Sequence, residues 1–366
     1  MNKFVFPLLA LAAMFCFAAN ALAADASPAP AQIALVGCAH IHTPDFAKRM
    51  KKRSDIAVKY VWDHDAARAQ KYGELLGATI VTDLNQIWND PKIVAVVICS
   101  ETDRHLDLVL AAAKARKHVY AEKPLGIDAK DSYAMAKAMQ DAGVMFQTGY
   151  FMRGEPVMQF LKQQVADGAF GKITRIRGCN AHSGALGGWF DKDYRWMADP
   201  KQSGIGGFGD LGTHSLDIML WIMNEPVDRV AAVTSNGTAR YEGCDELGEG
   251  ILMFHNGAIG TLAAGWDDVS NPVGLEICGT EGHAAIFNGK LLFQSKKVAG
   301  ADGKQPWTQL PPAWSHAFEL YLDAVAGKKD ATLVTGSEAA YRAAVMQALY
   351  DAAKGQKWAE VQQPPK

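Results

Sequence analysis

Short apolar runs alternate with helical patterns through the first 150 residues of the chain. The runs are rich in β-branched residues, and after each comes a turn and a segment with apolar positions three or four apart. Near-continuous apolar strands between helices are typical of a parallel sheet covered on both faces, so we expect a Rossmann-like α/β domain. The expected strands are residues 32–37, 56–63, 79–81, 93–100, 118–121 and 144–148, and the expected helices are residues 44–51, 66–76, 105–115 and 130–142.

The pattern changes after residue 150. A helix expected at residues 157–167 precedes longer strands in which apolar and polar positions alternate, with hairpin signals at Asn256-Gly257, Gly282 and Asn288-Gly289. These strands cover residues 173–182, 227–235, 250–266 and 273–294, and an amphipathic helix follows at residues 337–354. We therefore expect a Rossmann domain at residues 31–150 and, at residues 151–366, an α+β substrate and oligomerisation domain. Its sheet should be large, open and mostly antiparallel.

The first residues have the pattern of a secretory signal peptide. Lys3 precedes an apolar run that extends from Phe4 to Phe17, and Ala21-Leu22-Ala23 supplies small residues for cleavage. This run is too short for a membrane span, and no later segment is apolar enough to insert in a bilayer. We expect a leader over residues 1–23 and an exported, periplasmic protein.

Composition narrows the class of partner. The net charge is −2 and no basic stretch with interleaved aromatics occurs, which argues against nucleic acid and favours a small-molecule ligand. The cysteines that remain after leader cleavage have no C-x-x-C spacing and predict neither a disulfide framework nor a zinc site. An open sheet has a second face to cover, so we expect a homodimer or homotetramer. The cysteines are Cys38, Cys99, Cys179, Cys244 and Cys278.

A degenerate glycine loop follows the first expected strand. In dinucleotide-binding folds, a G-x-G-x-x-G loop permits a tight turn, and the amides of the next helix bind the pyrophosphate. Here Gly37 keeps the first position, while Ala39 and His42 occupy the second and third. Thr43 is the expected N-cap of the helix, with Pro44 at its first position.

An acid at the end of the second strand and a histidine pair in the loop add two further candidates. Asp63 lies where an acidic residue meets ribose hydroxyls, which favours NAD over NADP; alternatively it caps the next helix, a role that Asp65 could fill. His40 and His42 permit a metal site like those of barrel hydrolases, but the second half lacks barrel units. We expect no metal, with these histidines lining the cofactor loop.

An acid and a histidine four residues apart stand in the glycine-rich segment 206–217. On a helix, Asp210 and His214 share a face, so the carboxylate can orient the imidazole for acid–base work; alternatively, Asp210 merely caps a helix. Lys123 ends a buried parallel strand at the ligand crevice, and Pro124 keeps its backbone extended. There a lysine can stabilise an oxyanion, although an exposed loop lysine is the alternative.

Aromatic residues gather shortly before this segment. Such rings often pack on sugar faces, and two arginines could bind polar or anionic groups. A core role for some of the rings is equally compatible with the pattern. The candidate substrate-binding residues are Arg153, Trp189, Tyr194 and Arg195.

Together these motifs resemble the Gfo/Idh/MocA family, which includes glucose-fructose oxidoreductase and inositol dehydrogenase. The most specific are Glu122-Lys123-Pro124 and Asp210-x-Gly212-x-His214-x-x-Asp217. The resemblance implies that His214 takes the proton from a sugar or cyclitol hydroxyl and that Asp210 orients either His214 or that hydroxyl. It also implies that Lys123 stabilises the developing negative charge and that hydride passes to the nicotinamide. The cofactor-binding residues that we expect are Gly37, Ala39, His40, Ile41, Asp63, Ser100, Glu101, His105, Glu122 and Lys123.

Export leaves three functions open, because little free dinucleotide is available outside the inner membrane. The first is a nicotinamide-dependent dehydrogenase. The second is a redox-neutral enzyme with tightly bound NAD, such as an isomerase, epimerase, glycosidase or lyase that acts through a keto-sugar. The third is a non-catalytic exported sugar-binding protein.

Overall fold

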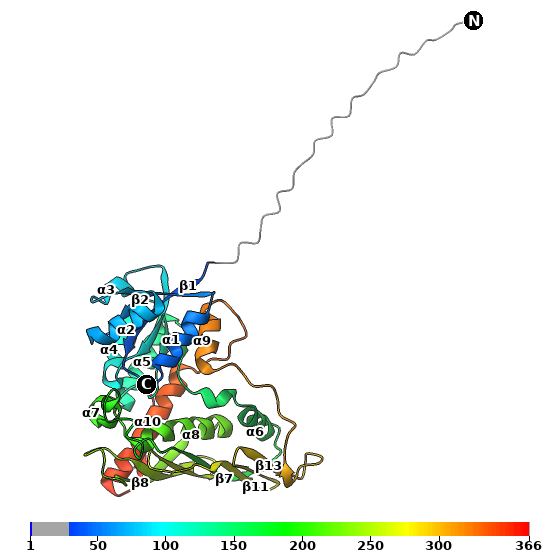
Figure 1. Ribbon diagram of the computed structural model, residues 1–366. Helices are drawn as coiled ribbons and strands as arrows, with labels where there is room; N and C mark the ends of the chain where they lie inside the picture. Colours follow the sequence, from blue (N-terminus) through cyan, green and yellow to red (C-terminus); the bar gives the residue numbers. More distant parts are fainter. Residues whose placement is uncertain (2–28, 366) are drawn as a thin grey trace.

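Two sheets organise the chain, with helices packed between them (Figure 1). The computed structural model describes residue 1 and residues 29–365. Apart from Met1, the predicted leader therefore lies outside the described residues. In the part of the chain that the structure describes, no helix is long and apolar enough to cross a bilayer.

The first sheet has the order β3-β2-β1-β4-β5-β6 and is parallel throughout, which confirms the predicted Rossmann-like domain. Asp65 caps α2 by accepting from two backbone amides, so Asp63 is not the cap. The predicted Thr43 cap is wrong: Thr43 is already helical, and His42 precedes it without a side-chain cap bond. The elements of this region are β1 (Ala31–Cys38), α1 (Thr43–Lys52), β2 (Ile56–Trp62), α2 (Ala66–Leu76), β3 (Thr79–Ile80), α3 (Asn85–Trp88), β4 (Ile93–Cys99), η1 (Thr102–Arg104), α4 (His105–Lys114), β5 (His118–Ala121), α5 (Ala129–Ala142) and β6 (Phe146–Gln147).

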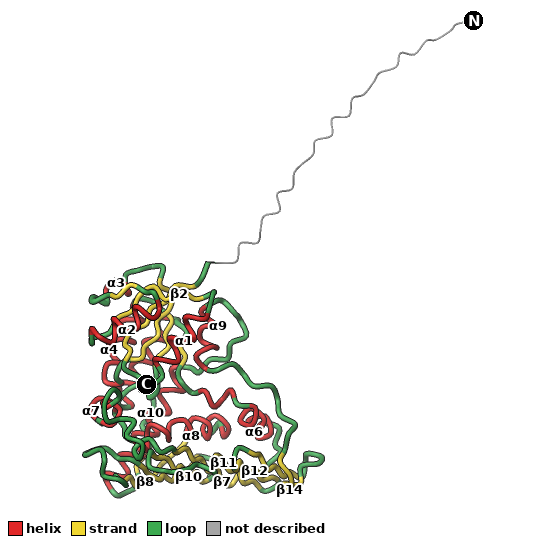
Figure 2. The backbone as a smooth tube through the Cα atoms, in the orientation of Figure 1, coloured by secondary structure: helices red, strands yellow, loops and turns green. Residues whose placement is uncertain are grey.

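The second sheet has the order β14-β13-β12-β11-β7-β10-β9-β8-β15, and every neighbouring pair is antiparallel except β7 and β10. Figure 2 shows α6 and α8 above one of its faces. The mostly antiparallel open sheet is thus confirmed. Its elements are η2 (Phe151–Gly154), α6 (Pro156–Ala166), β7 (Ile173–Ala181), η3 (Arg195–Ala198), α7 (Pro200–Ser203), α8 (Gly207–Met223), β8 (Val227–Ser235), β9 (Leu247–Phe254), β10 (Ile259–Gly265), β11 (Val273–Gly279), β12 (Gly282–Phe287), β13 (Lys290–Ser295), β14 (Asp302–Pro306), α9 (Ala317–Val325), α10 (Gly336–Gly355) and β15 (Ala359–Glu360).

Helix α9 was not expected from the sequence, and it returns to the first domain. Phe318 of α9 stacks on Phe46 of α1 with ring centres 4.1 Å apart, and Tyr321 donates to the carbonyl of Val96 in β4. These aromatic contacts cover one face of the parallel sheet. The C-terminal segment therefore completes the core of the Rossmann domain.

Helix α8 is buried almost throughout and carries the candidate acid and histidine. A Cβ at Gly207 would lie 2.2 Å from the carbonyl oxygen of Glu246, so only glycine lets the helix start this close to the neighbouring chain. The helix begins at Gly207, with Gly206 as its N-cap, and Asp210 lies inside the first turn. The alternative role of Asp210 as an N-cap is therefore wrong.

Candidate active site

Lys123 and Asp210 meet between the two domains. The Lys123 Nζ lies 2.6 Å from Asp210 Oδ1 and 3.3 Å from the Asp210 carbonyl oxygen. The Trp266 indole donates to Asp210 Oδ2 at 2.9 Å, and all three side chains are buried. The end of β5 and the first turn of α8 thus form one ion pair. This excludes the alternative of Lys123 as an exposed loop residue.

The surroundings of Asp210 favour its ionised form. Burial alone would raise the pKa of Asp210, but the Lys123 ammonium and the hydrogen bonds from Lys123 and Trp266 outweigh it and hold that pKa below its ordinary value. Asp210 is therefore an ionised carboxylate that neutralises and orients Lys123. It does not act as a proton donor.

His214 lies one helical turn after Asp210 and is also buried. Burial lowers its pKa well below the ordinary value, and the nearby Lys123 charge lowers it further. Its Nδ1 has no hydrogen-bond partner among the described residues. Lys123 and Trp266 each donate to one carboxylate oxygen of Asp210. In place of the expected Asp210–His214 contact, the structure therefore has a neutral His214 imidazole beside the Lys123–Asp210 ion pair.

The loop after β1 has the features of a phosphate cradle. Gly37 has φ +81°, and a Cβ there would lie 2.6 Å from Ser100 Cβ, so the ends of β1 and β4 approach closely. The N-terminus of α1 has no side-chain cap, and the buried Thr43 hydroxyl has no partner among the described residues. An uncapped helix start with an unpaired hydroxyl fits the pyrophosphate of a dinucleotide.

Asp63 is strongly bound within the protein. It accepts from the amides of Cys38 and Asp65 at 2.6 and 2.7 Å, and from Arg68 Nη2 at 3.0 Å. Arg68 also donates to Glu101 at 2.8 Å, so it bridges two predicted cofactor ligands. The expected ribose contact of Asp63 stays a prediction, and Arg68 is a cation beside it that sequence reasoning missed.

His40, His42 and Glu122 form a compact cluster at the same edge of the sheet. Their ligand atoms lie close enough for a metal ion, and Glu122 is fully buried. However, His40 Nδ1 accepts the His42 amide at 3.2 Å, and burial lowers the pKa of His40 to about 3. The neutral ring therefore carries its proton on Nε2, 3.8 Å from Glu122, where it offers no lone pair to a metal. His42 Nδ1 contacts Glu122 at 3.0 Å.

Other predicted cofactor residues have clear structural contacts. His105 Nδ1 lies 3.0 Å from the carbonyl of Leu125, which holds the turn after Lys123. The Ser100 hydroxyl donates to the Glu101 carbonyl, while Ile41 packs against the core. The Trp196 indole donates to the Ala39 carbonyl at 3.1 Å, so the second domain reaches the glycine loop directly.

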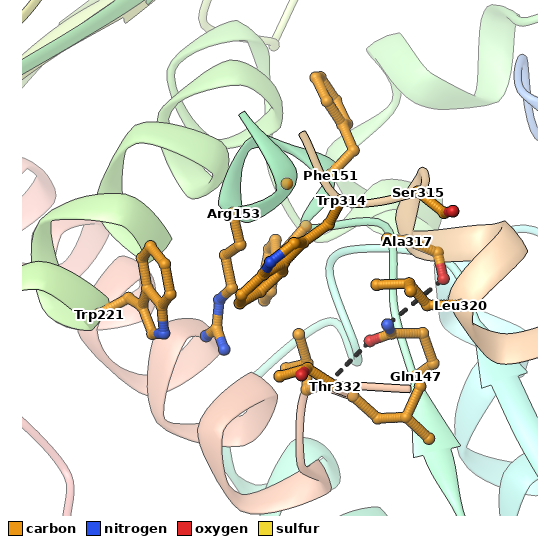
Figure 3. Close-up of a pocket in the computed structure, with 13 residues that line it drawn as sticks. Gln147, Phe151, Arg153, Trp221, Trp314, Ser315, Ala317, Leu320 and Thr332 are labelled. Carbon is orange, nitrogen blue, oxygen red and sulfur yellow. Dashed lines mark hydrogen bonds between the residues drawn. The ribbon is translucent and has the colours of Figure 1, made fainter. Parts of the chain in front are cut away.

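Arg153 is paired with two acidic residues. Arg153 binds Asp217 through Nε at 2.8 Å and Nη2 at 2.5 Å, and Glu338 through Nη1 at 2.9 Å. Figure 3 shows its side chain between the indoles of Trp221 and Trp314. Two carboxylates thus hold the Arg153 guanidinium, and its predicted contact with substrate stays a prediction.

The other predicted substrate residues occupy different surroundings. Arg195 donates to the Ala198 carbonyl at 3.2 Å, and its guanidinium lies 5.3 Å from the centre of the Tyr241 ring. Tyr194 is half-buried against the core. The Trp189 ring packs against His182 at an interplanar angle of 41°, with ring centres 4.7 Å apart. Sequence reasoning missed Trp266, because a residue at the end of a strand carries no signal of its partner.

Comparison with family models decides the relationship. A model described as "Oxidoreductase family, NAD-binding Rossmann fold" matches residues 31–150, and a "GFO/IDH/MocA C-terminal domain" model matches residues 158–285. This chain belongs to the Gfo/Idh/MocA family. The resemblance inferred from Lys123, Asp210 and His214 is therefore confirmed, together with an oxidoreductase assignment and NAD as the cofactor.

Individual members of the Gfo/Idh/MocA family are similar over part of the chain. Myo-inositol 2-dehydrogenase of Thermotoga maritima is 30% identical over 242 residues, which cover 63% of this chain and 67% of that protein. Levoglucosan dehydrogenase of Pseudarthrobacter phenanthrenivorans is 29% identical over 241 residues, which cover 57% and 58%. The crystal structure of aldose-aldose oxidoreductase from Caulobacter crescentus, complexed with glycerol, has 20% identity and a TM-score of 0.75 over 91% of this chain and 100% of that one. This last likeness shows a shared fold.

Proposed function

We propose that this protein oxidises a hydroxyl group of a sugar, a cyclitol or a related derivative by hydride transfer to NAD. The observation that carries the proposal is the buried Lys123–Asp210 pair with the neutral His214 one turn away. The group lies at the carboxyl ends of parallel strands, where open α/β sheets bind ligands. The relatives, which include an inositol and a levoglucosan dehydrogenase, support this substrate class.

The residues divide the reaction between them. His214 is neutral and accepts the hydroxyl proton, while Lys123 donates to the same oxygen and stabilises the charge that develops there. Asp210 holds Lys123 in place. NAD, when bound, accepts the hydride, so the alcohol becomes a carbonyl, NAD⁺ becomes NADH and one proton is released. The cradle at Gly37 and the uncapped start of α1 would hold its pyrophosphate.

The test compares NADH formation by the purified protein and its variants with myo-inositol, levoglucosan and D-glucose. Lys123→Met and His214→Ala should each lower kcat/KM by about a thousandfold, because each removes a proton-transfer or charge-stabilising group. NAD binding, followed by calorimetry, should persist. His255→Ala is the matched control, since His255 is exposed on the far sheet and should not change turnover. Normal turnover in His214→Ala would refute its role.

The two alternative functions are not favoured by the comparisons, because the matching family model is that of an oxidoreductase family and the inositol and levoglucosan relatives are dehydrogenases. A direct measurement separates all three. Denaturing the purified protein and assaying the supernatant for NAD would show stoichiometric cofactor for a redox-neutral enzyme. Failure to bind NAD at all would leave only a sugar-binding protein.

We also propose export and self-association. Export rests on the signal-peptide pattern of residues 1–23, and the mass of the mature N-terminus in the periplasmic fraction tests it. Self-association rests on large apolar side chains at the second sheet: Val233, Ile251, Ile259, Val273 and Phe287 are all exposed. Light scattering should show a dimer or tetramer, and a monomer would refute this proposal.

A further inference from the structure

A cysteine, a histidine and a glutamate lie together on the second sheet, where Figure 2 shows β11 and β12 side by side. Leu275 and Ile277 of β11 are buried in the core, so Glu276 and Cys278 point to the other face of the sheet. His283 of β12 precedes a buried alanine and lies on that other face as well. Glu276, Cys278 and His283 are all half-buried.

The register of the two strands brings these three side chains into one group. Cys278 is the direct partner of His283 in the β11–β12 ladder, and Glu276 precedes Cys278 by two residues on the same face. Their ligand atoms lie within 4.8 Å of one another, and His283 Nε2 is 3.0 Å from Glu276 Oε1. The sheet thus places a sulfur, a nitrogen and an oxygen donor next to one another.

Two arginines of β7 contact the outer side of this group. Arg177 Nη1 lies 2.8 Å from Glu276 Oε2, the carboxylate oxygen that does not contact His283, and Arg175 Nη2 lies 3.8 Å from the Cys278 sulfur. The hydrogen bond from His283 lowers the pKa of Glu276 further than burial raises it, and the Arg177 charge adds to the lowering, so the carboxylate is ionised. Outer hydrogen bonds of this kind orient the ligands of metal ions in proteins.

The donor types indicate which metal the group suits. Thiolate, imidazole and carboxylate are all ligands of Zn²⁺, and three protein ligands leave one tetrahedral position for water. Mg²⁺ and Ca²⁺ prefer oxygen ligands alone. When Zn²⁺ binds, the Cys278 thiol releases its proton to water, and the His283 imidazole ligates through Nε2 with its proton on Nδ1. The charges of the ion, the thiolate and the carboxylate then sum to zero, so the bound centre does not repel the two guanidinium groups.

We propose that Glu276, Cys278 and His283 form a zinc site that joins β11 to β12 near their hairpin turn. The site is independent of the proposed oxidation, because it lies across the sheet from α8: Leu275, which points the opposite way, pairs with Gly178 on the face that packs against α8. The ligands come from two strands in the spacing Glu-x-Cys-x4-His, which differs from the C-x-x-C pattern of common zinc motifs.

The test is a calorimetric titration of the untagged, full-length mature protein with ZnCl2, after dialysis against a chelator. One zinc ion should bind per chain, and MgCl2 at the same concentration should give no binding heat. Cobalt(II) is the spectroscopic probe, because a cobalt–thiolate bond adds an absorbance band in the near ultraviolet. Zinc should also raise the Tm of the wild-type protein, since it binds the folded state.

Variants identify the ligands. Cys278→Ala, His283→Ala and Glu276→Ala should each weaken zinc binding by more than about a hundredfold, because even outer partners of a metal ligand contribute about 10–100-fold. Cys278→Ala should also abolish the cobalt–thiolate band and the rise in Tm. Cys179→Ala is the matched control, since Cys179 is the half-buried cysteine of β7 and lies outside the group. Circular dichroism shows that each variant is folded.

Three results would overturn the proposal. Equal zinc affinity in wild type and Cys278→Ala would remove the sulfur from the site, and loss of the cobalt band in Cys179→Ala would place the thiolate ligand on β7 instead. A wild-type protein that binds well under one zinc ion per chain, or none, would show that the three donors do not form a metal site.

Discussion

Replacing Asp217 with asparagine should destabilise the protein strongly without changing its chemistry. Asp217 lies in α8, two helical turns after Asp210, and is 1% exposed. It accepts from Arg153 twice, at 2.8 and 2.5 Å, and from Arg342 Nε at 2.9 Å. An asparagine would present one oxygen and one NH2 group to these guanidinium groups and would remove the charge that compensates them.

The magnitude follows from this geometry. Removing one partner of a buried ion pair costs about 3–5 kcal/mol. Glu338 still compensates Arg153 at 2.9 Å in the Asp217→Asn variant, so we expect the lower end, about 3 kcal/mol. With a urea m-value of about 3 kcal/mol/M for a chain of this size, the unfolding midpoint should fall by about 1 M.

Urea unfolding followed by circular dichroism measures this shift, and Asp141→Asn is the control. Asp141 pairs with Lys137 on the surface, so its replacement should change stability by less than about 0.5 kcal/mol. A midpoint shift below about 0.3 M with an unchanged slope would refute the reasoning. Loss of turnover in folded Asp217→Asn would also refute it, because it would place Asp217 in the catalytic group.

Three further predictions concern pH, cofactor choice and cofactor release. Burial raises the pKa of Asp245 to about 6 from 3.8, so the folded state binds a proton more tightly than the unfolded state does. Urea unfolding should therefore show the free energy of unfolding falling by about 2.4 kcal/mol between pH 4 and pH 7, and Asp245→Asn should abolish that slope. Arg68→Ala removes the cation beside Asp63, so the ratio of kcat/KM for NAD to that for NADP should rise about tenfold. An unchanged ratio would show that Arg68 does not act at the ribose site. Trp196→Ala removes the bond to the Ala39 carbonyl, and stopped-flow fluorescence should show NADH release about fivefold faster, whereas an equal rate would mean that Trp196 does not retain the cofactor.

Sequence periodicity was sufficient to predict the fold. The apolar strands and the hairpin signals Asn256-Gly257 and Asn288-Gly289 are local features, and each corresponds to an observed strand or turn. Helix α9 was not predicted, because its aromatic residues pack on the parallel sheet, whose strands lie far away in the sequence. Its existence depends on a surface that no local pattern describes.

The candidate site was predicted less completely than the fold. Lys123 could be placed because the ends of parallel strands share one edge of a sheet. The partners of the charged groups could not be predicted, because tertiary packing determines them. Arg153 pairs with Asp217, which is 64 residues away in the chain, and Trp266 donates to Asp210 across 56 residues. The spacing along α8 predicts an Asp210–His214 contact, but in the folded protein Asp210 pairs with Lys123 instead.

The two acids of α8 show why one is suited to chemistry and the other to stability. Arg153 and Arg342 commit planar, multidentate donors to Asp217, which fixes a buried core network. Lys123 is a compact ammonium with three donors, and Asp210 takes two of them through its Oδ1 and its carbonyl oxygen. One N–H is therefore left to bind a substrate oxygen while the carboxylate still compensates the charge. An arginine at position 123 would spread its donors over a larger planar group. Lys123→Arg should therefore keep the ion pair but no longer direct the remaining donor at the substrate oxygen, so that kcat falls while the free energy of unfolding changes little.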